Sequence, residues 1–109
     1  MDFSFTPEQE SLREAIVRLC APFDADYWLR KDREGGFPDD FHRALADAGW
    51  LGIAMPEAHG GAGLGITEAA LMMQTIAATG AGLSGASAIH MNIFGLHPAV
   101  VFGTEEQKR

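Results

Sequence analysis

Hydrophobic residues recur at helical spacing from the start of the chain. After Thr6, apolar side chains return every three or four positions, which predicts an amphipathic helix with one buried stripe. Thr6 is the expected N-cap, Pro7 takes the first helical position, and Gln9 completes a capping box. Pro22 is expected to end or kink this helix. The stripe consists of Leu12, Ala15, Ile16, Leu19 and Phe23.

A second apolar stripe follows a polar stretch. Residues 24–36 are polar and charged and end in two glycines, so they predict a partly helical, exposed connection. A helix is expected from Pro38, with acidic residues in its first turn, to a stop at Gly49. Trp50 and Leu51 are then positioned to fold back onto this helix. The predicted inner face consists of Phe41, Ala44, Leu45 and Ala48.

The middle of the chain is rich in glycine. Residues 52–65 hold five glycines and a proline and predict a long loop. Helices are expected over residues 67–79 and 84–95, separated by a break at residues 80–82, and a short helical turn begins at Pro98. The predicted inner face of the first of these helices is Ala70, Leu71, Met73, Ile76 and Ala77. No segment shows the alternating pattern of a strand, so the fold class is all-α, a helical bundle with a Gly-rich inter-helix loop.

The last residues carry another helix signal. Gly103 is expected to end the preceding turn in a left-handed conformation. Thr104 and Gln107 then form a second capping box, which marks the start of a further helix. Because a single helical turn cannot offset its nucleation cost, we expect residues 1–109 to be the front of a longer protein, truncated at the start of its fifth helix.

Composition narrows the classes of function. The chain has 109 residues and a formal net charge of −7, which argues against a nucleic-acid partner and against binding to an anionic membrane surface. No stretch is long and apolar enough for membrane insertion, and no signal peptide is expected. The lone Cys20 excludes an internal disulfide, fits a reducing cytoplasm, and lies in a helical stripe that predicts a core position.

Two patterns resemble chemical motifs. Residues 80–85 spell G-x-G-x-x-G, but a dinucleotide site needs a strand before this motif, so a helix–helix turn is expected instead. The glycine run of residues 60–65 lacks the Lys-Ser/Thr of a phosphate loop and predicts a structural turn. His42 and His59 are expected in solvated surface or loop positions. No histidine has a cysteine or carboxylate at ligand spacing, so no metal site is predicted.

The helix expected over residues 84–95 is the candidate ligand surface. Its small residues predict that something packs closely against it. Ala86 or Ser87, together with His90 and Phe94, would lie along one side at helical spacing. Tight helix–helix packing and a ligand channel both explain this side, and composition leaves the two open.

Three segments carry a family resemblance. They are residues 5–9 (FTPEQ), residues 49–65 (GWLGI, PE and GGAGLG) and residues 98–109 (a proline, then FGTEEQKR). In their order and spacing they resemble the N-terminal helical domain of the acyl-CoA dehydrogenase family over essentially the whole chain. Family members continue into the rest of the fifth helix, a middle β-domain and a C-terminal helical domain, which the resemblance implies are absent from residues 1–109.

The resemblance implies the front of an FAD-dependent oxidoreductase of fatty-acid or related acyl metabolism. Such enzymes remove the α-proton of an acyl-CoA thioester with a glutamate, pass the β-hydride to flavin, and deliver electrons to an electron-transferring flavoprotein. The base and most of the flavin site lie in the absent regions, so no catalytic or cofactor-binding residue is expected here. The full-length protein is expected to form a homo-oligomer, mainly through its C-terminal bundle.

In the family, the fourth helix of this domain helps to wall the acyl pocket. The resemblance places Ala86, Ser87, His90 and Phe94 at that wall. Because His90 and Phe94 are bulky, we expect a short, branched or ring-bearing acyl group. The remaining alternatives are an acyl-CoA oxidase, a nitroalkane oxidase or a flavin monooxygenase of the same fold, or a stand-alone helical interaction module without catalytic activity.

Overall fold

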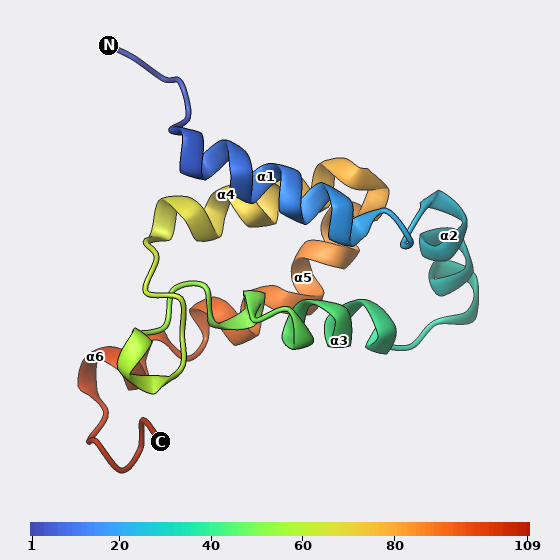
Figure 1. Ribbon diagram of the computed structural model, residues 1–109. Coiled ribbons are helices and arrows are strands. Elements are labelled where there is room, and N and C mark those ends of the chain that lie inside the picture. Colours follow the sequence, from blue (N-terminus) through green and yellow to red (C-terminus); the bar gives the residue numbers. More distant parts are fainter.

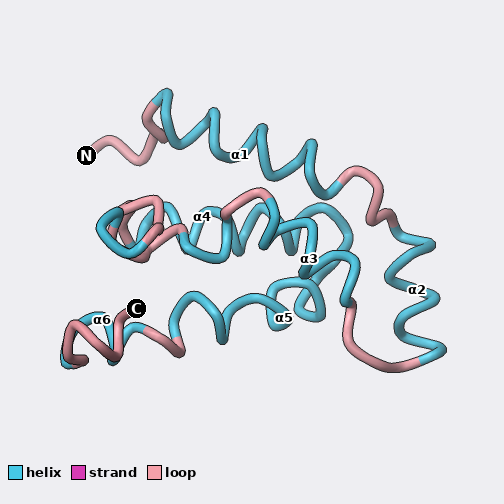
Figure 2. Tube along the Cα trace, turned by 60° about the horizontal axis from the view of Figure 1, so that its bottom comes forward, coloured by secondary structure: helices cyan, strands magenta, loops and turns pink.

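Helices α1 (Pro7–Cys20) and α4 (Ile66–Ile76) lie side by side along one layer of the molecule (Figure 1). The computed structural model describes residues 1–109 and contains helices and loops without strands (Figure 2), which confirms the predicted all-α fold. Helices α3 (Asp39–Asp47) and α5 (Gly82–Phe94) form a second layer. None of the helices combines the length and apolar character needed to cross a membrane.

Two shorter helices lie at opposite ends of these layers. Helix α2 (Ala25–Glu34) lies at the end where α1 stops, and α6 (His97–Phe102) lies near the C-terminus (Figure 1). The core lies between the layers and includes several side chains that are fully shielded from solvent. They are Ile16, Phe41, Leu45, Ile53, Met72, Ile76 and Ile89.

Helix α1 begins and ends as its sequence predicts. The Thr6 hydroxyl accepts a hydrogen bond from the Gln9 backbone N–H at 3.2 Å, and Gln9 Oε1 accepts one from the Thr6 N–H at 3.0 Å. Both bonds of the capping box are therefore present, and they satisfy two N–H groups that a helix terminus leaves free. Leu12, Ile16 and Cys20 are buried along the inner side of α1.

The connection predicted over residues 24–36 is helical as expected, over helix α2, but it is not exposed throughout. Asp24 caps this helix by accepting a hydrogen bond from the Tyr27 N–H at 2.9 Å. Tyr27 and Trp28 are buried, and the Trp28 indole N–H donates to the Phe23 carbonyl at 3.1 Å. Two aromatic anchors thus hold α2 on the bundle although most of its other residues are charged.

Helix α3 confirms the second predicted stripe except at its end. Phe41 and Leu45 are fully buried, but Ala48 is exposed because the helix stops at Asp47. The stop follows from Gly49, whose φ of +81° is a left-handed conformation that favours glycine. The next residues form the 3₁₀ turn Trp50–Gly52, which contacts α3 as predicted.

The Gly-rich segment after α3 is the predicted loop, but it contains a second 3₁₀ turn, Glu57–His59. The loop folds back on itself, and the Gly63 N–H donates to the Met55 carbonyl at 2.8 Å. Gly61 lies against the backbone of Met55 so closely that a Cβ atom would overlap it. Only glycine allows this close approach of the two backbone segments. The glycine at this position therefore has a structural role, as expected for a structural turn.

Helix α4 is rotated by about one residue from the predicted inner face. Leu71 and Ile76 are buried as expected, whereas Ala70 is exposed and Ala69 and Met72 are buried instead. Both the predicted and the observed sets have helical periodicity, so the sequence pattern did not distinguish them. The direction from which α1 packs on α4 selects the observed face.

A tight corner joins α4 to α5. The chain passes through a π-helical turn, Ala77–Ala81, and Gly80 and Gly82 have φ values of +101° and +55°. The G-x-G-x-x-G sequence therefore forms the helix–helix turn that was predicted, with a helix on each side of it. These two positive φ values explain the glycine spacing without any bound dinucleotide.

The C-terminal residues confirm one expectation and correct another. The Thr104 N–H donates to Gln107 Oε1 at 2.9 Å, and the Gln107 N–H donates to the Thr104 hydroxyl at 3.3 Å, as a capping box requires. Gly103 is not left-handed, because its φ of −69° and ψ of 150° place it in extended backbone. Helix α6 therefore ends by extension of the chain.

Candidate functional site

The buried side of α5 packs against α2 and against the turn Ala77–Ala81 that joins α4 to α5. A Cβ atom built on Gly85 would lie 3.3 Å from both Ile76 Cγ2 and Trp28 Cζ2, and closer still to the Ala81 methyl group. A side chain at this position would therefore push α5 away from its neighbours. Glycine permits the close approach, and Ile89 continues the buried side toward the middle of the helix.

The four candidate residues on α5 follow the border between its buried and exposed sides. Ala86 is only 8% exposed, Ser87 is exposed, and His90 and Phe94 are half-buried. All four residues lie on one helix, as the sequence pattern predicted, but they differ in how deeply they are buried. Ala86 lies under the surface, and the other three residues reach it.

The structure brings Ser87 and His90 together. His90 Nδ1 lies 3.0 Å from the Ser87 backbone carbonyl. A carbonyl oxygen only accepts, so Nδ1 carries the proton and Nε2 is the ring nitrogen that remains for another partner. This contact orients the imidazole along the helix, so that the ring forms part of the surface of α5.

A shallow groove continues this surface toward the start of α3. It has a volume of about 420 Å³ and shares Ser87 with the candidate set. Sequence reasoning missed this groove because its two sides are more than forty residues apart in the chain. Besides Ser87 and Gly36, its lining consists of Phe37, Pro38, Leu83, Ser84 and Ala88.

The environment of His42, close to this groove, differs from the prediction. It was predicted to be solvated, but it is half-buried, and its Nε2 lies 3.2 Å from Asn92 Oδ1 on α5. The amide oxygen is an acceptor, so the imidazole nitrogen donates in this pair. The ring also stacks edge-on with Phe37, with centroids 5.4 Å apart. His42 therefore links the start of α3 to α5.

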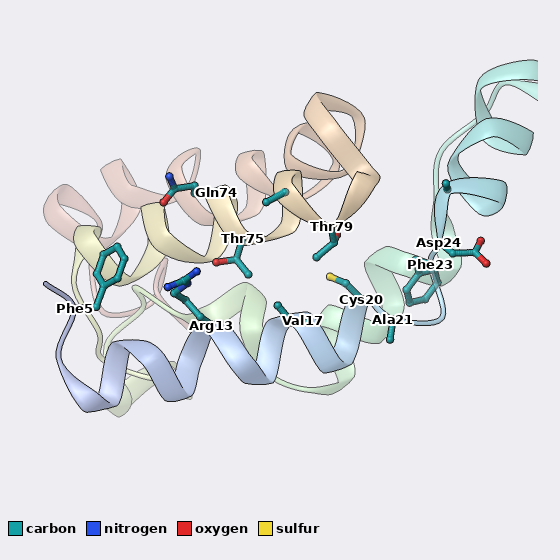
Figure 3. A pocket seen from close by; sticks show the side chains of 12 residues that line it. Phe5, Arg13, Val17, Cys20, Ala21, Phe23, Asp24, Gln74, Thr75 and Thr79 are labelled. Atoms are coloured by element: carbon teal, nitrogen blue, oxygen red, sulfur yellow. The ribbon is translucent and has the colours of Figure 1, made fainter.

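A larger hollow of about 640 Å³ lies between α1 and the end of α4 (Figure 3). Cys20 reaches its floor and is 2% exposed, which confirms the predicted core position. Burial raises the pKa of the Cys20 thiol, and the nearby Thr79 hydroxyl only partly opposes this. The reactive form of cysteine is the thiolate, so this thiol is poorly suited to nucleophilic chemistry.

The hydroxyl groups around that hollow are already paired. Thr75 Oγ1 donates to the Leu71 carbonyl at 2.7 Å, and Thr79 Oγ1 donates to the Ile76 carbonyl at 2.7 Å. The helices thus offer surfaces for binding, and neither hollow joins a nucleophile to a base.

Comparison with known proteins gives the class of this domain. Residues 6–109 match the family model described as "Acyl-CoA dehydrogenase, N-terminal domain". The chain therefore belongs to the acyl-CoA dehydrogenase family, as its sequence motifs indicated. No solved structure gives a significant match.

Curated relatives support the same assignment. The probable acyl-CoA dehydrogenase YngJ of Bacillus subtilis is 33% identical over 100% of this chain and 28% of its own length. The acyl-CoA dehydrogenase FadE12 of Mycobacterium tuberculosis is 32% identical over 99% of this chain and 28% of its own length. The benzylmalonyl-CoA dehydrogenase of Aromatoleum aromaticum is 33% identical over 82% of this chain and 24% of its own length. The chain thus spans about a quarter of the length of each of these relatives.

Proposed function

We propose that these residues form the N-terminal helical domain of a longer, FAD-dependent acyl-CoA dehydrogenase. The family match over residues 6–109 supports this, as does the chain's coverage of only 28% of relatives such as YngJ. In the proposed enzyme, a middle β-domain and a C-terminal helical domain supply the remaining length and the glutamate base. The enzyme oxidises the α,β bond of an acyl-CoA thioester.

The residues of this chain do not by themselves fit FAD. Its only dinucleotide-like sequence, residues 80–85, forms a helix corner, and a Cβ atom on Gly85 would lie only 3.3 Å from Trp28 and Ile76 side-chain atoms. No room is left there for a pyrophosphate to approach the backbone. We therefore assign the flavin site to the remaining length of the proposed enzyme.

The cellular setting belongs to the same proposal. The enzyme is proposed to work in the cytoplasm as a homo-oligomer and to deliver its electrons to an electron-transferring flavoprotein. The free thiol of Cys20 is consistent with a reducing compartment. Family membership supports the partner and the assembly.

The observation that carries the pocket role is the border between the buried and exposed sides of α5. His90 and Phe94 are half-buried and form no hydrogen bond or ion pair with another helix. Ligand pockets typically combine apolar walls with a few placed polar groups, and these two side chains provide one of each. We propose that Ala86, Ser87, His90 and Phe94 wall the acyl pocket, with Ala86 supporting the wall from beneath.

Side-chain volume suggests which acyl groups fit. A histidine and a phenylalanine one helical turn apart leave little room for a long straight chain, so a short, branched or ring-bearing acyl group is proposed. The name of the relative from Aromatoleum aromaticum, benzylmalonyl-CoA dehydrogenase, refers to a ring-bearing thioester and supports the last of these options.

The test is the substitution His90→Ala in the full-length protein. Removal of the imidazole should raise kcat/KM for longer acyl-CoA substrates relative to shorter ones by roughly tenfold, the lower end of what one or two methylene groups contribute in an apolar pocket. The matched control is His97→Ala, which removes an exposed imidazole on α6. An unchanged chain-length profile in His90→Ala would contradict the pocket assignment.

A further inference from the structure

We propose that Phe37 closes the distal end of the acyl pocket and thereby limits the size of the acyl group that the enzyme accepts. The inference rests on the proposed function and extends the pocket from α5 to the segment between α2 and α3. It assigns a specificity-determining role to a residue that lies outside the candidate set on α5.

The groove beside α5 is continuous with the proposed acyl wall. Ser87 belongs to both surfaces, and Leu83, Ser84 and Ala88 lie on the α5 side of the groove. Phe37 and Pro38 form the opposite side. An acyl group that runs along Ser87 therefore reaches the Phe37 ring without crossing a helix.

The chemistry of the groove fits a neutral, apolar occupant. Its seven lining residues include no charged side chain, so it offers nothing to pair with a phosphate or a carboxylate. Phe37 is 48% exposed and Leu83 is 83% exposed, so the groove offers two large apolar side chains to an occupant. A volume of about 420 Å³ lies within the range of small-molecule pockets. The distal part of an acyl group satisfies each of these conditions.

The position of Phe37 is fixed relative to α5. Its ring stacks on His42, and His42 is hydrogen-bonded to Asn92 on α5 at 3.2 Å. Gly36, with a φ of +89°, turns the chain into this position, and Pro38 is buried beside it. A side chain held in this way can exclude larger groups, because a freely moving ring would yield to them.

The experiment measures kcat/KM of the full-length protein for acyl-CoA thioesters of increasing chain length and branching. Phe37→Ala should shift the preference toward larger acyl groups by roughly tenfold, as expected when an apolar pocket gains the room of a few methylene groups. Phe37→Trp should shift it in the opposite direction. The matched control is Leu29→Ala on α2, which removes a side chain of similar exposure, 47%, that does not line the groove.

The possible outcomes separate this inference from the proposed function. Opposite shifts in Phe37→Ala and Phe37→Trp, with Leu29→Ala unchanged, would support it. If His90→Ala changes the profile and neither Phe37 variant does, the inference is wrong and the proposed function stands. A uniform loss of activity toward all substrates, or a changed oligomeric mass with an unchanged profile, would show that Phe37 has a structural or subunit-contact role instead. A wild-type protein that oxidises no acyl-CoA would overturn both proposals.

Discussion

The core between the two helix layers and the outer side of α5 and α6 differ in how far their apolar side chains are exposed. Ile16 and Met72, at the centre of the first region, are 0% exposed, whereas Leu83 and Phe102, in the second, are 83% and 85% exposed. Burial of one large apolar side chain contributes about 1.5–3 kcal/mol, so the first region holds most of the stability of the domain. The second region presents large exposed apolar side chains, Leu83, Met91, Val101 and Phe102, and these favour a binding surface, so this is where we expect function.

The largest expected effect comes from Phe41 in the first region. Its ring is fully buried and stacks edge-on with Phe23 and Trp28, at centroid distances of 5.5 and 5.0 Å. Phe41→Ala should lower the free energy of unfolding by about 3–5 kcal/mol, because it removes buried area and leaves a cavity. Urea denaturation followed by tryptophan fluorescence measures this change.

The control for this prediction lies in the second region. Phe102→Ala removes the same ring from an exposed position and should change the free energy of unfolding by less than about 0.5 kcal/mol. Equal losses of stability in the two variants would show that the two regions do not differ in the way described here.

Gly85 tests the boundary between the two regions. Gly85→Ala places a methyl group against Ala81, Ile76 and Trp28, and should lower the free energy of unfolding by about 1–3 kcal/mol through overpacking. Ser84→Ala, at the exposed neighbouring position, is the control and should leave stability nearly unchanged. If Gly85→Ala were neutral, α5 could move outward freely and would not be a fixed wall.

The smallest expected effect is a pH dependence at the start of α4. A hydrogen bond from the Gln9 side chain, at 2.9 Å, is the main cause that lowers the pKa of Glu68 below its ordinary value of 4.5. The folded state therefore binds this proton less tightly than the unfolded state does. The resulting stabilisation is present above pH 4.5 and is lost as pH falls through the lowered pKa of the folded protein.

Comparison of two capping boxes isolates this effect. Gln9→Leu should weaken the loss of thermal stability between about pH 5 and pH 3, the interval that spans the ordinary carboxyl pKa. Gln107→Leu removes the equivalent glutamine from the second capping box and should leave that interval unchanged, because Gln107 lies far from Glu68 in the chain and bonds Thr104. An identical pH profile in Gln9→Leu and the wild type would contradict the assigned cause.

The parts of the fold that the sequence predicted depend on local signals. The first capping box, the stop at Gly49 and the corner at residues 80–82 each need only a few adjacent residues, and all three are confirmed. The attachment of helix α2 to the core was missed, because most of its residues are charged and only Tyr27 and Trp28 are buried. Asp24, three residues before Tyr27, was the available N-cap signal for the helix.

The parts that could not be predicted depend on residues distant in sequence. The bond between His42 and Asn92 spans fifty residues, and the groove at Phe37 exists only because two separate segments meet. Sequence periodicity placed the four candidate residues on one helix, but burial of Ala86 follows from the packing of α5 against the core. A helical pattern defines a face and does not reveal what that face contacts.

The central claim is that this domain belongs to a flavoenzyme acting on acyl-CoA, and one titration tests it most directly. The native gene product, purified from its source cells, is titrated anaerobically with short and branched acyl-CoA thioesters while its visible absorbance is recorded. The account predicts bound flavin whose absorbance is bleached by stoichiometric acyl-CoA, in a protein of mass well above 11.7 kDa. A native product of 11.7 kDa, or a larger protein whose flavin is absent or unchanged by every thioester, would contradict it.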